Sequence, residues 1–197
     1  AVCVGTGVGV NALLSRRLGE QDRAGASAVA LNGVFVYLLS WLVFLLFGLF
    51  LARPFMGFFT CDPLITDYGG IYLSIVTCCS VGITMQFATE RILLASGDPL
   101  GPMIIQGIGA VLNLILDPLL IFGCGPVPPL GVAGAALATV SGQLLGMTVG
   151  FFLVSGRKDL SLSLRRFRPS GDVIREIYRI GLPAIVMQSL ATFMTLG

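Results

Sequence analysis

Long stretches without charge are the feature that most limits what this chain can fold into. A helix needs roughly 20 mostly apolar residues to cross the hydrocarbon core of a bilayer, which is about 30 Å thick. Three stretches of the 197-residue sequence reach that length, residues 24–52, 68–89 and 99–156, and the last contains a single charge, Asp117. A mean hydropathy of +0.93 with 11% charged residues, against about 25% in soluble domains, points the same way.

A Pro- and Gly-rich segment at residues 123–131 divides the third stretch in two, so the sequence predicts four complete membrane spans. The uncharged segments at the two ends, 1–15 and 180–197, are interpreted as two truncated spans. The predicted fold class is therefore all-α, a polytopic transmembrane helix bundle, and the predicted location is the cell membrane with multiple passes.

The basic residues fall on alternate loops of this arrangement. Eleven of the twelve Lys and Arg residues lie in the first, third and fifth of five loops, which are 16–23, 53–67, 90–98, 123–131 and 156–180. The positive-inside rule then predicts that these three loops are cytoplasmic. The basic run 165–168 is interpreted as a topology signal that contacts anionic lipid, so no nucleic-acid partner is expected. Residues 172–180 have the spacing of an interfacial amphipathic helix.

Asp117 is the only ionisable residue well inside a predicted span. Placing an ionisable side chain in the membrane costs free energy, so a functional role is the first hypothesis for Asp117. Asn113 precedes it by four residues and Gln106 by eleven, which places all three near one helical face. Pro118 has no N–H, so the carbonyl of Leu114 loses its helical partner and a bend is predicted there. Such oxygen ligands suit a hard cation such as Na⁺, and a carboxylate can alternatively carry a proton. The competing interpretation is that Asp117 only caps or hydrogen-bonds a neighbouring helix.

The residue inventory argues against an enzyme. The chain has no histidine, no His/Cys metal cluster, no pair of intramembrane aspartates and no serine beside an evident base. In the span 132–155, Gly142, Gly146 and Gly150 recur every four residues, which favours close helix packing. We therefore predict a protein without catalytic residues, metal or cofactor.

Several segments in order along the chain resemble the multidrug and toxic compound extrusion (MATE) family. The most specific are Asn-x-x-x-Asp-Pro at 113–118 and Gly-Val-Ala-Gly-Ala-Ala at 131–136, accompanied by Ser-Gly-Asp-Pro at 96–99 and Gly-Leu-Pro at 181–183. The resemblance implies a twelve-helix transporter with two six-helix lobes. It assigns residues 1–155 to helices two to six of the amino-terminal lobe, 156–180 to a basic inter-lobe loop, and 181–197 to the start of helix seven.

The resemblance also implies a function and a site. Asp117, Asn113 and Thr139 correspond to the family's cation site, and Gln106, Gln143 and Gln188 are candidates for lining the transport cavity. A member of this family would use Na⁺ or H⁺ as the coupling ion, export amphipathic and often cationic drugs by alternating access, and contact the lipid bilayer.

Two other functions remain open from the sequence. A lipid-linked oligosaccharide or peptidoglycan-precursor flippase of the same superfamily would line its cavity with several Arg or Lys residues, and the predicted spans contain none. A membrane scaffold or an intramembrane enzyme would tolerate Asp117→Ala.

Overall fold

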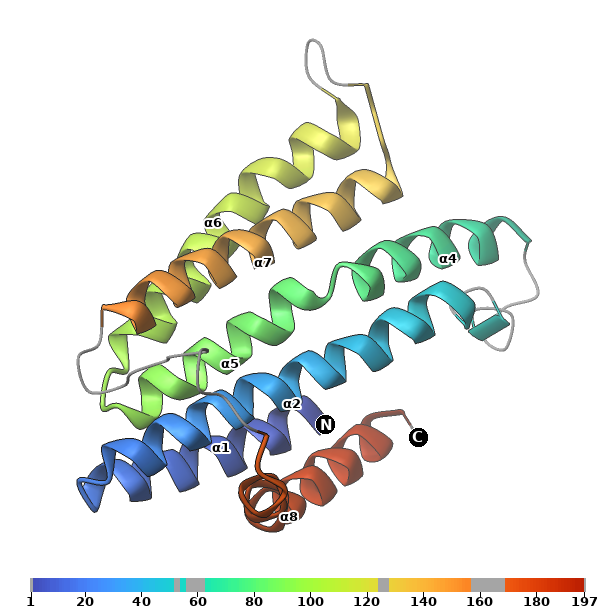
Figure 1. Cartoon of the computed structure of the whole chain (residues 1–197). Helices are drawn as coiled ribbons and strands as arrows, with labels where there is room; N and C mark the ends of the chain where they lie inside the picture. Colours follow the sequence, from blue (N-terminus) through green and yellow to red (C-terminus); the bar gives the residue numbers. More distant parts are fainter. Residues whose placement is uncertain (1, 52–53, 56–62, 124–127, 157–168, 197) are drawn as a thin grey trace. The chain divides into compact units, whose positions relative to one another are not determined.

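The computed structural model describes residues 2–51, 54–55, 63–123, 128–156 and 169–196. These residues form helices and contain no strand, which confirms the all-α prediction (Figure 1). The basic run 165–168 and the neighbouring Arg157 and Lys158 lie outside the described residues. The helices are α1 (Val2–Gly19), α2 (Arg23–Phe50), α4 (Pro63–Cys78), α5 (Val81–Ala95), α6 (Leu100–Phe122), α7 (Val132–Ser155) and α8 (Gly171–Leu196).

Helices α2, α6 and α7 are long and apolar enough to cross a membrane. A fourth span results if the bent pair Leu64–Cys78 and Val81–Ala95 is counted as one, because its two helices meet at 44°. Helices α2, α6 and α7 match uncharged stretches of the sequence, and the bent pair overlaps the stretch 68–89 but extends beyond both of its ends. The number of complete spans predicted from charge spacing therefore agrees with the helices found among the described residues.

The predicted end of the second span is wrong. The sequence suggests one span at 68–89 followed by a loop at 90–98, whereas α4 ends at Cys78 and α5 continues to Ala95. Glu90 and Arg91 therefore lie inside a helix, and Glu90 is only 3% exposed. The physical reason is that a charged side chain does not interrupt the backbone hydrogen bonds of a helix, so the helix continues past it.

Helix α8 also differs from the prediction. An amphipathic helix at 172–180 and a separate span from 181 were expected, but Gly171–Leu196 is one helix that passes through Pro183. A proline removes one helical hydrogen bond without ending the helix when packing holds the rest of it in place. Here that packing comes from α1, against which α8 lies (Figure 1).

The described residues group into two compact units. Unit 1 comprises Ala1–Leu39, Phe87–Met103 and Val149–Gly197, and its centre is the contact between α1 and α8. Glycines permit this contact: a β-carbon on Gly9 would overlap the carbonyl of Ile177, and one on Gly181 would overlap the carbonyl of Gly5. The two helix backbones therefore touch, as small residues allow in membrane helix pairs.

Unit 2 comprises Ser40–Gln86 and Ile104–Thr148. Within it the end of α2 lies against α4, where Ser74 donates a hydrogen bond to the carbonyl of Gly48 over 3.3 Å. Helices α6 and α7 run antiparallel side by side (Figure 1). The start of α5 packs on α7, since a β-carbon on Gly82 would lie 3.1 Å from Cβ of Gln143. Unit 2 thus brings α5, α6 and α7 together around the predicted site.

Candidate functional site

Helices α6 and α7 meet at three successive levels in unit 2. Glycines make two of them, because a β-carbon on Gly142 would lie 2.9 Å from the carbonyl oxygen of Gly109, and one on Gly134 would overlap the carbonyl of Leu120. At the middle level the side chains of Asn113 and Thr139 approach each other. The levels are Gly109 with Gly142, Asn113 with Thr139, and Leu120 with Gly134. The glycine contacts therefore bring the polar pair at the middle level into hydrogen-bond range.

The side-chain amide of Asn113 lies between Asp117 and Thr139. With its nitrogen toward the carboxylate, it donates to Oδ2 of Asp117 over 2.8 Å, and its oxygen accepts from the backbone N–H of Thr139 over 3.3 Å. The opposite orientation instead places its nitrogen 3.4 Å from Oγ1 of Thr139. We assign the first orientation because it gives each amide atom a partner of opposite hydrogen-bonding character. The three residues named by the sequence resemblance are thus brought together.

A cavity of about 370 Å³ opens beside this cluster. That volume falls within the roughly 300–1,000 Å³ typical of small-molecule sites. The described residues that line it include one carboxylate, that of Asp117, and no basic side chain. The lining residues are Gln86, Gln106, Gly109, Ala110, Asn113, Leu114, Asp117, Thr139, Gly142 and Gln143. The described residues of the lining therefore carry one formal charge, and it is negative.

Two glutamines line the cavity where α5 meets α7. Gln143 was a candidate from the sequence, and its Oε1 atom is buried with no hydrogen-bond partner. Gln86 on α5 was not predicted, because nothing in its local sequence relates it to the polar residues of α6 and α7. Gly146 lies next to the Gln86 amide, and its glycine repeat was a signal that another helix packs closely against α7. The sequence alone does not identify that helix as α5.

The remaining predicted residues have separate positions. Gln106 is exposed on α6 and lines the cavity. Gln188 is exposed on α8 in unit 1 and is not among the residues that line the cavity. Pro118 lies inside α6, which continues through it to Phe122. The bend at Pro118 stays a prediction, and the carbonyl of Leu114 lacks the N–H that a non-proline residue would supply.

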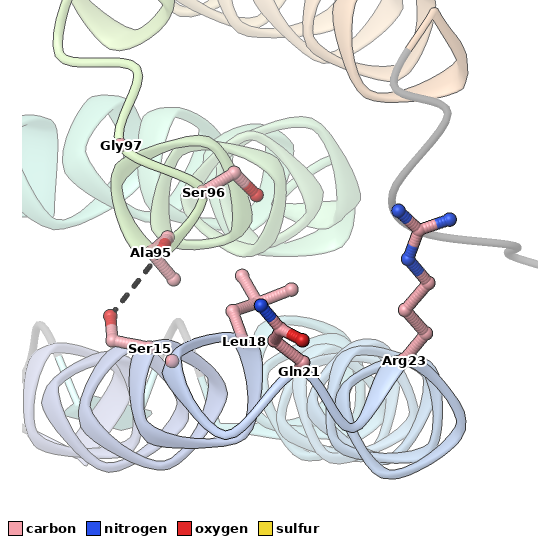
Figure 2. Close-up of a pocket in the computed structure, with 8 residues that line it drawn as sticks. Ser15, Leu18, Gln21, Arg23, Ala95, Ser96 and Gly97 are labelled. Atoms are coloured by element: carbon pink, nitrogen blue, oxygen red, sulfur yellow. Dashed lines mark hydrogen bonds between the residues drawn. The ribbon is translucent and has the colours of Figure 1, made fainter.

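A second cavity, of about 600 Å³, lies in unit 1 between the α1–α2 turn and the end of α5 (Figure 2). Arg23 and Gln21 extend toward it from the turn, and the hydroxyl of Ser15 donates to the carbonyl of Ala95 over 3.5 Å. The described residues that line it include no carboxylate, and the nearby Asp22 accepts a hydrogen bond from the backbone N–H of Gly25 at the start of α2.

Comparisons with known proteins agree with the geometry. Residues 1–119 match the MatE family model. The chain is 24% identical over 185 residues to the probable multidrug resistance protein NorM of Thermotoga maritima, covering 94% of this chain and 40% of that protein. It is 32% identical over 166 residues to a FAD transporter of Shewanella oneidensis, covering 78% of this chain and 34% of that one.

A solved structure described as MATE in the bent conformation superposes with a TM-score of 0.87 at 26% identity, covering 97% of this chain and 43% of that one. The chain thus spans about 40% of the length of the relatives it matches. The matched residues include the α6 segment that supplies Asn113 and Asp117. The chain belongs to the MatE family of multi-pass membrane transporters.

Proposed function

We propose that this chain contributes the cation-binding lobe of a multidrug antiporter, which exports amphipathic cationic compounds in exchange for Na⁺ or H⁺. The observation that carries the proposal is that, among the described residues, Asp117 is the only charged side chain lining the unit 2 cavity. Relatives named for multidrug resistance and multidrug export support the choice of substrate.

One carboxylate gives a physical basis for exchange. A coupling ion and a cationic drug both need a negative partner, and the lining of this cavity offers only Asp117. Binding of one cation therefore lowers the affinity for the other, as any shared site requires. The ion also has to bind one conformation of the transporter more tightly than the other, because a ligand with equal affinity for both leaves their equilibrium unchanged.

An anionic cargo is the second candidate, because one relative is named a FAD transporter. Recognition of phosphate groups relies on Arg or Lys side chains or on clustered backbone N–H groups. The described lining of the unit 2 cavity includes no Arg or Lys. The same argument disfavours a flippase for lipid-linked precursors, so we retain the cationic substrate.

The test is gradient-driven efflux from proteoliposomes that contain the full-length protein. A cationic dye is loaded, Na⁺ and H⁺ gradients are imposed separately, and wild type is compared with Asp117→Asn. We expect one gradient to drive efflux in wild type and the substitution to abolish it. Asp67→Asn is the matched control, because Asp67 is an exposed acid on α4 outside the cavity. Retention of efflux by Asp117→Asn contradicts the proposal, as does the absence of dye movement under both gradients in correctly inserted wild type.

A further inference from the structure

We infer that Arg91 on α5 forms an intramembrane ion pair with a carboxylate on a transmembrane helix of the full-length transporter outside residues 1–197. Such a pair would fasten unit 1 to the rest of the transporter. It is separate from the candidate cation site at Asp117, and it does not depend on the proposed function.

The Arg91 side chain lies over a gap that Gly7 leaves in α1. A β-carbon on Gly7 would lie 2.9 Å from Nε of Arg91, 3.1 Å from its Cγ and 2.7 Å from the hydroxyl oxygen of Tyr37 on α2. Tyr37 is 1% exposed, and its hydroxyl donates to the carbonyl of Cys3 over 3.0 Å. Three helices of unit 1 therefore meet at the guanidinium, and glycine at position 7 leaves the room that it occupies.

Two contacts show that this side chain points toward the interior of the span. The hydroxyl of Ser15 donates to the carbonyl of Ala95 over 3.5 Å, so these residues lie at one level of α1 and α5. Gly7 is eight residues before Ser15 and Arg91 is four before Ala95, which at about 1.5 Å per residue places Gly7 about 6 Å further from that level than the Arg91 backbone. A basic side chain near the end of a span usually bends toward the membrane surface. Arg91 instead extends away from the end of α5.

The described residues provide no counter-charge for Arg91. Its Nε atom is buried without a hydrogen-bond partner, and none of the ion pairs among the described residues includes it. The neighbouring Glu90 is 3% exposed, but residues next to each other on a helix do not face each other. An arginine keeps its charge in proteins, and charged side chains inside a membrane almost always pair with a partner. The guanidinium therefore requires an anion from elsewhere.

Asn11 is the competing acceptor within α1. It follows Gly7 by four residues on the same helical face, and its Oδ1 atom is buried without a partner. A hydrogen bond between Asn11 and Arg91 would satisfy both atoms, but an amide oxygen leaves the positive charge uncompensated. A carboxylate supplies the opposite charge and accepts two parallel N–H bonds from a guanidinium. We therefore assign the partner as an acidic side chain.

Another helix of the same transporter is the source that the observations favour. The chain spans about 40% of the length of the relatives it matches, so more than half of the full-length protein can supply the acid. Arg91 is half-buried, because its Nε atom is enclosed while part of the side chain stays open. A facing helix can reach that open part.

The experiment is a charge-rescue scan of the full-length protein. Arg91→Leu is expected to lower the melting temperature by several degrees, because it leaves the partner carboxylate buried and unpaired. Each Asp and Glu in the apolar segments outside residues 1–197 is then changed to Asn or Gln in the Arg91→Leu background. One of these second changes is expected to restore the melting temperature. Exchange of the two charges, with Arg91→Glu and the identified acid changed to Arg, is expected to restore it as well, which a purely packing role of Arg91 would not allow.

Arg16→Leu is the matched control. Its side chain is 67% exposed and pairs over 3.0 Å with Glu20 on the same helix, and the loss of such a surface pair costs little. No acid substitution outside residues 1–197 is expected to compensate for it. If Arg91→Leu yields no folded protein, recovery of monodisperse protein in the double variants is measured in place of the melting temperature.

An unchanged melting temperature in Arg91→Leu overturns the inference, and so does the failure of every second substitution to restore folded, stable protein. In the second case, stabilisation of wild type by added chloride would identify a small anion as the partner. A loss of stability in Asn11→Leu equal to that in Arg91→Leu would instead identify Asn11. Because unfolding is measured without a gradient, a failure of dye efflux would refute the antiporter proposal separately.

Discussion

The backbones of Gly109 and Gly142 touch where α6 crosses α7, so that a β-carbon added to Gly142 would lie 2.9 Å from the carbonyl oxygen of Gly109. One turn further along α6, Asn113 reaches Thr139 on α7. The distance between the helices at the glycine pair therefore sets the distance between the polar side chains of the candidate site. A substitution at one of these glycines, which have no side chain, can thus be used to test the site.

Gly142→Ala is expected to push α6 and α7 apart and to destabilise the protein by about 1–3 kcal/mol, which is typical of overpacking at a close contact. Dye efflux is also expected to fall in Gly142→Ala, because Asn113 moves away from Thr139. Gly107→Ala on α6 is the control, since an added β-carbon there meets nothing within 4 Å. Thermal unfolding of the purified protein measures the difference, and equal melting temperatures for the two variants would contradict a tight crossing.

The hydrogen bonds around Asn113 predict an order of effects. Asn113→Leu removes both the donor to Asp117 and the acceptor for the backbone N–H of Thr139, and we expect a loss of efflux approaching that of Asp117→Asn. Thr139→Val removes only a hydroxyl, which already donates to the carbonyl of Ala135 over 3.0 Å. Its backbone N–H remains, so a smaller loss is expected. Efflux rates under a fixed gradient test the order, and a greater loss for Thr139→Val would reverse the assignment of the Asn113 amide.

The sequence predicts the part of the site that lies on a single helix. Asn113 and Asp117 are four residues apart, and helical periodicity alone places them on one face. Thr139 was identified only through the family resemblance, because its place opposite Asn113 depends on how α7 packs against α6. Gln86 could not be identified, since its role depends on a contact between α5 and α7 that no local pattern encodes.

The helices divide in the same way, into features set by the local sequence and features set by packing between helices. Charge spacing located the apolar helices α2, α6 and α7, because the cost of burying charge in lipid acts residue by residue. It failed at Glu90, where a buried charged residue lies inside a helix that the charge was expected to end. It also missed the break at Cys79 and Ser80, which contains neither proline nor glycine and is stabilised by contacts distant in sequence.

Trp41 provides one of those contacts, and Trp41→Phe tests it. The indole Nε1 of Trp41 donates to the carbonyl of Cys78, the last residue of α4, over 3.3 Å. Phenylalanine keeps most of the apolar surface but cannot donate, so the substitution is expected to destabilise the protein by about 1 kcal/mol. Thermal unfolding measures the effect, with Tyr72→Phe on the exposed surface of α4 as the control. Equal loss of stability in both variants would show that the hydrogen bond contributes nothing.

A hydrogen bond between Asn32 and Ser170 gives the last prediction. Oδ1 of Asn32, a residue that is 1% exposed on α2, accepts from the backbone N–H of Ser170 over 3.0 Å, directly before α8 begins. Asn32→Leu leaves that part-buried N–H without its acceptor, and the loss of a typical hydrogen bond costs about 1 kcal/mol.

Faster hydrogen exchange at the Ser170 amide is therefore expected in Asn32→Leu, together with a lower melting temperature. Thr192→Val serves as the control because its exposed hydroxyl bonds only within α8, to the carbonyl of Gln188. Unchanged exchange at Ser170 in Asn32→Leu would mean that the start of α8 is held by its packing on α1 alone. Faster exchange confined to this amide would instead show that a side chain 138 residues earlier in the sequence fixes where α8 begins.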